Sequence, residues 1–107
     1  MVTIVTEVEL KQGSEVRWDQ LMRERMATVK ARAGWIGGQL LQPDDDPRRR
    51  VIVGTWQTRD DWKEWHADPT FKKTRAELDQ LVNGPEHHSW HDVVLEMRPG
   101  TGHAGNP

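Results

Sequence analysis

The stretch TWQTRDDWKEWHADPTF, residues 55–71, joins a strand to a broken helix. Trp56 closes an apolar run that begins at residue 51 and predicts a strand. Thr58 is then a suitable helix N-cap, and Asp61 three residues later completes a variant of the capping box. Negative charge predominates in the first turns of this helix, where the helix dipole favours it. The stretch therefore predicts a strand that leads directly into a capped helix.

Two tryptophans and one histidine of this helix share one face. Trp65 lies three residues and His66 four residues after Trp62, and these spacings place side chains next to one another on a helix. Asp68-Pro69 then interrupts the helix, because proline disfavours helical geometry at the preceding residue and is suited to the first position of a new helix. We therefore expect aromatic rings and one imidazole to gather at a corner of the fold.

The rest of the chain predicts further elements on either side of this stretch. The expected elements are strands at 2–10, 35–42, 51–56 and 90–97, a helix at 15–33, and a helix from Thr58 that resumes at Phe71 and runs to Val82. Gly34 is expected to end the first helix and Asn83-Gly84-Pro85 the second. Gly37-Gly38 predicts a bulge or a close backbone approach.

This order predicts an α+β fold of the ferredoxin-like type, β-α-β-β-α-β, with an antiparallel four-stranded sheet and both helical segments on one face. Both faces of the predicted sheet carry apolar residues. A small domain with a bare apolar sheet face usually buries it against a copy of itself. We therefore expect a homodimer joined through the sheet face.

Composition excludes several classes of protein. The 107 residues suffice for one domain, predicted at residues 1–97, followed by a Gly/Pro tail at 98–107 that we expect to be disordered. The absence of cysteine excludes disulfides and predicts a cytoplasmic protein. No signal peptide and no membrane-spanning run is expected. A net charge of -2 argues against a nucleic-acid-binding surface.

Residues 53–71 carry the pattern V-G-T-W-x-x-x-x-x-W-x-x-W-x-x-x-P-x-F. With this pattern and its element order, the chain from residue 2 to residue 97 resembles the antibiotic biosynthesis monooxygenase family of dimeric α+β barrels. The family includes cofactor-free oxygenases of aromatic polyketides, quinol oxygenases and haem-degrading enzymes. The resemblance implies a homodimer that oxidises a small aromatic molecule with O₂.

Two branches of the family are compared residue by residue. Haem-degrading members use an Asn on the first strand, a Trp on the helix and an iron-ligating His ten residues later. These positions hold Thr6, Trp65 and Arg75 here. Arginine stays protonated and cannot ligate iron. Polyketide-type oxygenases place an Asn one turn before the helix Trp, where this chain has Asp61.

The chemistry of a cofactor-free oxygenase requires a base, an apolar aromatic cavity and a donor for an oxyanion. We expect His66 as the base, because its intrinsic pKa suits that role, and Trp65 as a second catalytic residue that stacks on the substrate and offers its indole N–H. Thr6, Asp61 and Arg75 are the expected substrate-binding residues.

Neither a metal nor a cofactor is expected. The His87-His88-Ser89-Trp90-His91 run has poor metal spacing, since residues 87 and 91 of a strand lie about 13 Å apart. Two alternatives stay open. One is a non-catalytic dimer that binds a hydrophobic small molecule, and the other is a haem-binding or haem-degrading relative with altered ligands.

Overall fold

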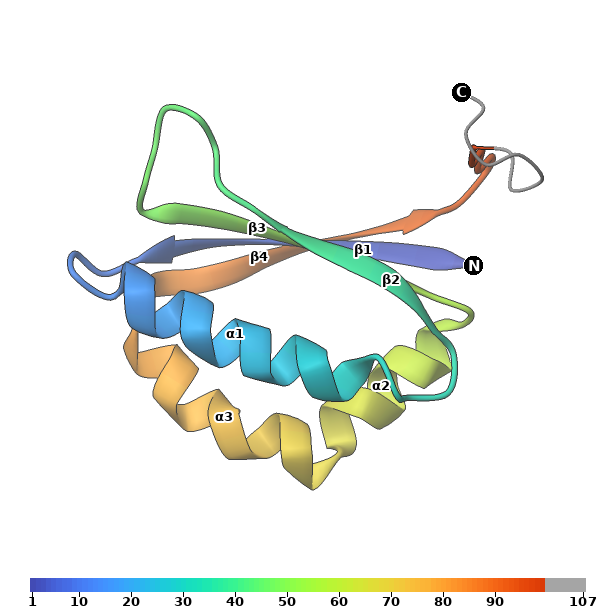
Figure 1. The fold of residues 1–107 in the computed structure, drawn as a ribbon, viewed down its shortest axis with the longest axis horizontal. Helices are drawn as coiled ribbons and strands as arrows, with labels where there is room; N and C mark the ends of the chain where they lie inside the picture. The colour runs from blue at the N-terminus through green and yellow to red at the C-terminus, as the bar shows by residue number, and fades with distance from the viewer. Residues whose placement is uncertain (100–107) are drawn as a thin grey trace.

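The computed structural model describes residues 1–99, which form a four-stranded sheet with three helices on one face (Figure 1). The elements are β1 (Val2–Leu10), α1 (Glu15–Val29), β2 (Trp35–Leu41), β3 (Arg49–Trp56), α2 (Arg59–Ala67), α3 (Pro69–Gln80) and β4 (Val82–Asp92). All strand pairs are antiparallel, in the order β2-β3-β1-β4. The predicted ferredoxin-like α+β fold is confirmed.

The last eight residues of the predicted C-terminal tail, 100–107, lie outside the described residues. Within residues 1–99, none of the helices has both the length and the apolar character needed to cross a membrane.

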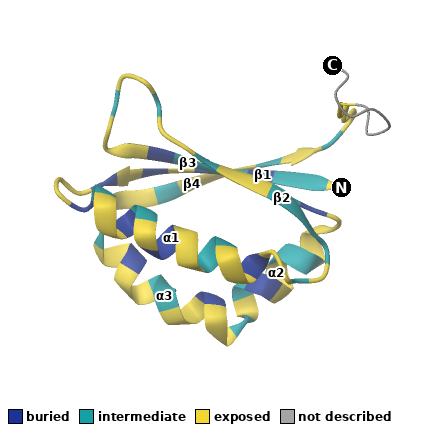
Figure 2. Cartoon of the chain, in the orientation of Figure 1, coloured by how far each residue is buried: buried dark blue, intermediate teal, exposed yellow. Residues whose placement is uncertain are grey.

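The core lies between the sheet and the helices, where Figure 2 shows most of the buried residues. Strand β1 is central, and four of its even-numbered residues, Ile4, Thr6, Val8 and Leu10, are buried. Because side chains alternate along a strand, these four residues face the helices together. Within residues 1–99, no helix covers the opposite face of the sheet (Figure 1).

The break between α2 and α3 follows the predicted chemistry. The Thr58 hydroxyl accepts a hydrogen bond from the Asp61 N–H, and the Asp61 carboxylate accepts one from the Thr58 N–H, so the capping box is confirmed. At the break, the Asp68 carboxylate accepts a hydrogen bond from the Thr70 N–H, and Pro69 begins α3. These contacts fix where α2 presents its aromatic face.

Helix α1 ends at Val29, four residues before the predicted end. Gly34 therefore does not end the helix directly and instead lies in the turn before β2 with a φ of +84°. A Cβ at this position would collide with the carboxylate of Asp61, so the turn requires glycine. At Gly37-Gly38, a bulge or a close backbone approach was predicted. The β2–β3 register shifts just before this pair, between Trp35 and Gly37, and a Cβ on Gly38 would lie 2.7 Å from the Val53 carbonyl oxygen, so the close approach is confirmed.

The predicted bounds of the last strand were wrong. Strand β4 spans Val82–Asp92 rather than residues 90–97, and α3 ends at Gln80. Gly84, with a φ of +73°, and Pro85 lie inside β4, where the register with β1 shifts between Glu7 and Glu9. A bulge accommodates both residues, and β4 is an edge strand, which tolerates the missing N–H of proline.

Candidate functional site

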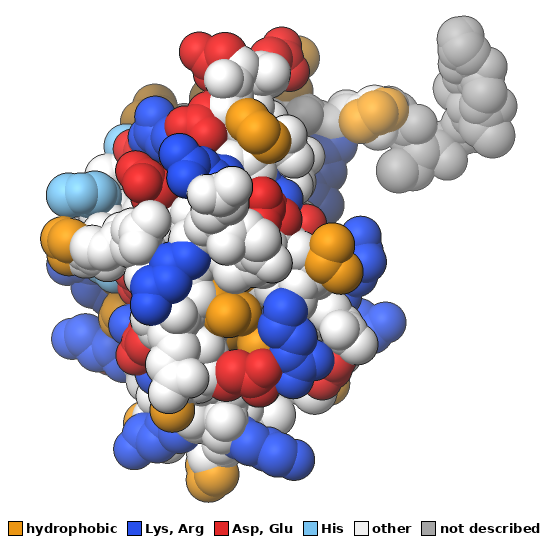
Figure 3. Space-filling view, turned by 90° about the vertical axis from the view of Figure 1, so that its left-hand side faces the viewer, with side chains coloured by type: hydrophobic (Ala, Val, Ile, Leu, Met, Phe, Trp, Pro, Cys, Tyr) orange, Lys and Arg blue, Asp and Glu red, His pale blue; other side chains and the backbone are white. Residues whose placement is uncertain are grey.

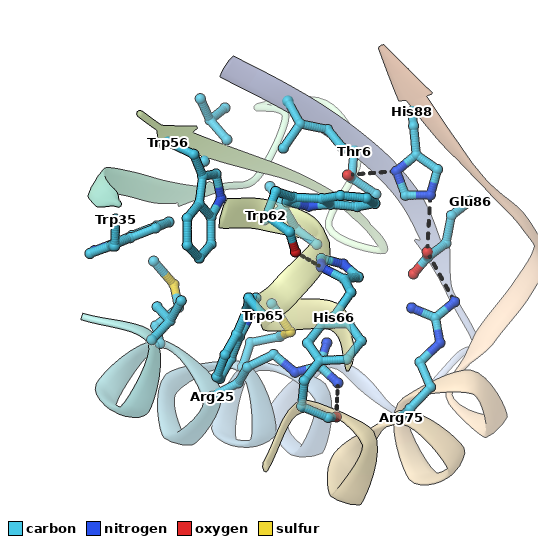
Figure 4. Close-up of a pocket in the computed structure, with 18 residues that line it drawn as sticks. Thr6, Arg25, Trp35, Trp56, Trp62, Trp65, His66, Arg75, Glu86 and His88 are labelled. Carbon is cyan, nitrogen blue, oxygen red and sulfur yellow. Dashed lines mark hydrogen bonds and ion pairs between the residues drawn. The ribbon is translucent and has the colours of Figure 1, made fainter. Parts of the chain in front are cut away.

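A cavity of about 100 Å³ lies between the sheet and the helices, at the end of the domain where α2 meets α3 (Figure 4). Four of the six tryptophans line it, Trp35, Trp56, Trp62 and Trp65. Aliphatic side chains complete most of the wall, and polar side chains line one side. Figure 4 shows Thr6 and His88 reaching this side from the sheet, and Arg25 and Arg75 reaching it from the helices. The cavity is therefore aromatic with a charged margin.

His66 is held between two aromatic rings. Its ring centroid lies 3.8 Å from that of Trp62 and 4.0 Å from that of Phe71. His66 Nδ1 lies 3.0 Å from the Trp62 carbonyl oxygen. A carbonyl oxygen only accepts hydrogen bonds, so Nδ1 carries the proton of the neutral ring and Nε2 keeps its lone pair. Among residues 1–99, no hydrogen-bond partner meets this Nε2.

Burial lowers the pKa of His66 to about 4, and the positive charges of Arg25 and Arg75 act in the same direction. The hydrogen bond to the Trp62 carbonyl opposes the shift but does not reverse it. The ring is therefore neutral at pH 7, and the intrinsic pKa on which its expected role as the base rested does not apply in the folded chain. The sequence did not reveal how far stacking between two rings would remove this imidazole from water.

The polar side of the cavity contains a chain of contacts that ends on α3. Thr6 Oγ1 lies 3.0 Å from His88 Nδ1. His88 Nε2 lies 3.4 Å from Glu86 Oε1, and Arg75 Nη2 lies 3.3 Å from the same oxygen. A proton on Nε2 would face the carboxylate, and the Thr6 hydroxyl would then donate to Nδ1.

Sequence reasoning missed Glu86 and His88 because it began the last strand at residue 90. In the observed register, Thr6 pairs directly with His88 across β1 and β4, so both side chains face the helices. Period-two alternation counted back from Trp90 would have placed residues 88 and 86 on this inner face.

Arg25 on α1 was also missed. Its Nε and Nη2 groups donate hydrogen bonds to Thr74 Oγ1, at 3.1 and 2.7 Å, and Nη2 also donates to the Phe71 carbonyl at 3.1 Å. The guanidinium carbon lies 3.9 Å from the centroid of the Phe71 ring. The available signal was its position, because a residue three after Met22 and four before Val29 lies on the apolar stripe of the helix.

The predicted site residues divide into two groups. Thr6, Trp65, His66 and Arg75 all line the cavity. Asp61 is not among the lining residues, since its carboxylate accepts hydrogen bonds from the Thr58 N–H and hydroxyl at the start of α2. The roles of all five residues in binding or catalysis stay predictions.

The residues at the cavity do not fit a haem. Arg75 stands where haem-degrading relatives have their iron ligand, and its guanidinium is engaged by Glu86 and Asp79. The volume of about 100 Å³ is far below the roughly 300–1,000 Å³ of pockets that hold cofactors and drug-sized ligands. Within residues 1–99, no three His, Cys, Asp or Glu side chains are grouped as metal ligands.

Comparison with known proteins gives a family and a fold. The family model described as antibiotic biosynthesis monooxygenase matches residues 1–77. No curated protein matches the sequence. A Nitrosomonas europaea protein whose name places it with these monooxygenases superposes with a TM-score of 0.84 at 17% identity, over 89% of this chain and 100% of that chain.

Two further structures share the fold. SnoaB, a cofactor-independent oxygenase from Streptomyces nogalater, superposes with a TM-score of 0.79 at 18% identity, over 92% of this chain and 97% of its own. Rv0793 from Mycobacterium tuberculosis gives a TM-score of 0.81 at 15% identity, over 91% and 98% of the two chains. At these identities the likeness shows the shared fold, and a shared fold does not by itself imply a shared reaction.

Proposed function

Because the chain belongs to the antibiotic biosynthesis monooxygenase family, we propose that it is a cofactor-independent monooxygenase that oxidises an aromatic, quinol-like or polyketide-like small molecule with O₂. The observation that carries this proposal is the convergence of three features in one cavity. An imidazole with a free Nε2, aromatic walls and two arginines all meet there. The cofactor-independent oxygenase SnoaB has the same fold.

The reaction places simple demands on the protein. A substrate with an acidic methylene loses a proton to a base, and the resulting carbanion gives electrons to O₂. In the overall change the methylene becomes a carbonyl, one oxygen atom enters the product, and the other leaves as water with the two hydrogens removed. A quinol ring follows the same first step when it loses a hydroxyl proton. The protein has to accept the proton, exclude water and stabilise the anion.

The cavity residues can be assigned to these steps. His66 Nε2 accepts the proton, Trp65 stacks on the ring and offers its indole N–H, and Thr6 or Arg75 donates to the oxyanion. A pKa of about 4 makes His66 a weak base, but it also keeps Nε2 unprotonated at pH 7. Positive charge from the arginines offsets this weakness, because it stabilises the substrate anion and so lowers the substrate's own pKa.

Oxygen uptake with anthrones and with quinols, in the presence of a chelator, tests the proposal. Trp65→Phe keeps an aromatic ring but removes the indole N–H. We expect oxygen uptake to fall about tenfold, as for the loss of one hydrogen-bond donor to a developing charge, while ligand binding changes less than about twofold.

Trp18→Phe is the matched control, because Trp18 is equally buried but lies in the core away from the cavity. Its oxygen uptake should follow that of the unmodified protein. No uptake with any anthrone or quinol, or an equal loss in both variants, would contradict the proposed activity.

A non-catalytic binder is the second candidate, and the low pKa of His66 favours it. Such a protein would show saturable quenching of tryptophan fluorescence by an aromatic ligand but no oxygen uptake. A haemin titration separates the haem-binding alternative. Because the cavity does not fit haem, we expect no shift of the Soret band.

We also propose that two copies join through the face of the sheet that the helices leave bare. Val5, Val51 and Val53 occupy this face and are only partly buried in the single chain. Beyond β4 the chain leaves the sheet on this side (Figure 1) and exposes Val94 and Met97, at 95% and 83% of their surface. Apolar side chains this exposed favour burial against a partner.

Sedimentation tests the dimer. We expect twice the 12.4 kDa of one chain for the unmodified protein and one chain for Val53→Asp, because a carboxylate in a packed apolar interface is left unpaired. Val16→Asp is the control, since Val16 is exposed on α1, on the helical side. An unmodified protein that sediments at 12.4 kDa would contradict the proposal.

A further inference from the structure

Arg25 is a partly buried cation without an acidic partner. Within residues 1–99, no carboxylate oxygen lies within 4.0 Å of its guanidinium nitrogens. Its Nε and Nη2 groups bond the Thr74 hydroxyl and the Phe71 carbonyl, whereas Nη1 has no partner among the described residues. Buried charges in proteins are normally paired, because an unpaired charge pays a large desolvation penalty. Arg25 therefore has a charge and a donor, Nη1, that an anion could satisfy.

Arg50 is a buried arginine of the same fold that does have a carboxylate partner. Its side chain is also buried, and the Asp19 carboxylate accepts hydrogen bonds from its Nε and Nη2 at 2.9 and 3.0 Å. Arg50 and Arg25 therefore differ in their partners. Arg50 is paired with a carboxylate, whereas Arg25, which lines the cavity, has none among residues 1–99.

The side chains that line the cavity carry a net positive charge, since two arginines, Arg25 and Arg75, face one carboxylate, Glu86. Arg75 is paired with Glu86 and also with Asp79, which lies outside the lining. Burial lowers the pKa of Arg25 to about 10 and the neighbouring Arg75 adds to this effect, whereas Glu86 and Asp79 oppose it. Arg25 therefore stays charged at pH 7, in surroundings that favour the arrival of an anion.

The size of the cavity limits the ligand. Its volume of about 100 Å³ allows no more than a single ring, since an apolar cavity of roughly 150 Å³ in another protein holds one benzene. Among the substrates proposed above, a quinol therefore meets this limit and a three-ring anthrone does not. The rings of Trp62, Trp65 and Phe71 line this space and offer stacking and edge contacts. A single ring can rest against them while one substituent reaches the charged side.

We propose that the cavity takes a single-ring aromatic ligand with an anionic oxygen substituent, a carboxylate or a phenolate, and that Arg25 is its counter-ion. This inference rests on the proposed function, since it narrows the substrate of that same cavity. Nη1 supplies the donor for the anionic oxygen, while the bonds to Thr74 and Phe71 hold the guanidinium in place. A bound anion also raises the pKa of the nearby His66 and makes it a stronger base.

Binding of sodium benzoate and of benzamide, measured by quenching of tryptophan fluorescence, tests the inference. The two probes share size and ring but differ in charge. We expect benzoate to bind the unmodified protein at least about tenfold more tightly than benzamide, as for a charge-assisted hydrogen bond. Arg25→Gln should remove this preference by weakening benzoate binding about tenfold, with benzamide binding unchanged.

Arg23→Gln is the matched control, because it removes the same charge from an exposed position on α1. It should change benzoate binding less than about twofold. If Arg25 only ties α1 to α3, the unmodified protein will bind both probes equally or neither, and the inference is overturned. This comparison of probes needs no variant, so an Arg25→Gln protein that fails to fold leaves the test intact.

The two proposals fail in different ways. If benzoate binding depends on Arg25 but no quinol or anthrone supports oxygen uptake, the monooxygenase proposal fails and the anionic ligand stands. If neutral quinols support oxygen uptake while benzoate and benzamide bind alike, the activity stands and the anionic ligand fails.

Discussion

The two ends of the core are built from the same sheet and helices but differ in how they are filled. At one end, aliphatic side chains from β1, α1 and α3 pack around Trp18 in a cluster that we call the closed end. Its buried members are Val8, Leu10, Trp18, Leu21, Met22 and Leu78. At the other, the open end, the buried members are Val29, Trp56, Trp65 and Phe71, and the cavity lies among them.

The two ends are filled differently because their side chains differ in shape and because the open end has a glycine beneath one of its rings. Flexible aliphatic chains fill the closed end, whereas rigid rings at the open end meet edge to face, as Trp65 and Phe71 do at 5.7 Å. In the sheet, the ring of Trp35 lies close over Gly38, and a Cβ there would meet both this ring and the Val53 carbonyl at 2.7 Å. Glycine at this position thus allows the Trp35 ring to lie close against the sheet.

The surface over the closed end is solvated and carries charges of both signs. Figure 3 shows basic and acidic side chains interspersed over one end of the molecule, the side where the β1–α1 turn lies, with hydrophobic side chains scattered singly. The closed end lies beneath this solvated surface. We infer that the closed end supplies stability and that the open end, with its partly buried His66 and Arg25, supplies function.

Leu10→Ala tests this division with the largest expected effect. Leu10 is fully buried at the closed end, so the lost side chain should leave a cavity that costs about 3 kcal/mol of unfolding free energy in urea denaturation. Met26→Ala is the counterpart beside the open end, where Met26 is only partly buried and should cost about half as much. Equal losses for the two variants would contradict the division.

The sequence predicted the secondary structure at both ends but only part of the cavity at the open end. Period-two and helical spacing identified β1, α1 and the capped helix with Trp62, Trp65 and His66, because these signals are local. Arg25 and His88 were missed since their importance depends on neighbours from distant elements. Asp61, which the family resemblance suggested for substrate binding, does not line the cavity, because its carboxylate is held by Thr58 at the start of α2.

Gly38→Ala tests whether glycine shapes the open end. The added methyl group would meet the Val53 carbonyl and the Trp35 ring, so we expect a loss of about 2 kcal/mol and weaker binding of aromatic ligands. Gly37→Ala is the control, since a Cβ there meets nothing within 4 Å. Unchanged stability and binding in Gly38→Ala would show that the Trp35 ring can move aside without consequence.

His66→Gln has the smallest expected effect and tests whether the open end holds a neutral imidazole. The pKa of His66 is about 4 in the folded chain and about 6.5 in an unfolded one. Between these values the unfolded chain binds the extra proton, so stability is retained above pH 6.5 and is lost as the pH falls toward 4. The pKa values of Asp68 and Glu77 are lowered by their hydrogen-bond partners, so these carboxylates also lose stability as the pH falls, equally in the unmodified protein and in the His66 variant. Urea denaturation at pH 7 and pH 4.5 should therefore show a loss of unfolding free energy on the order of 1 kcal/mol in the unmodified protein that His66→Gln lacks, after allowance for solvent screening of the half-buried ring.

His87→Gln is the control, because residue 87 is exposed on β4, and this variant should retain the loss. An equal fall in unfolding free energy in all three proteins would show that the imidazole of His66 is accessible to protons in the folded state.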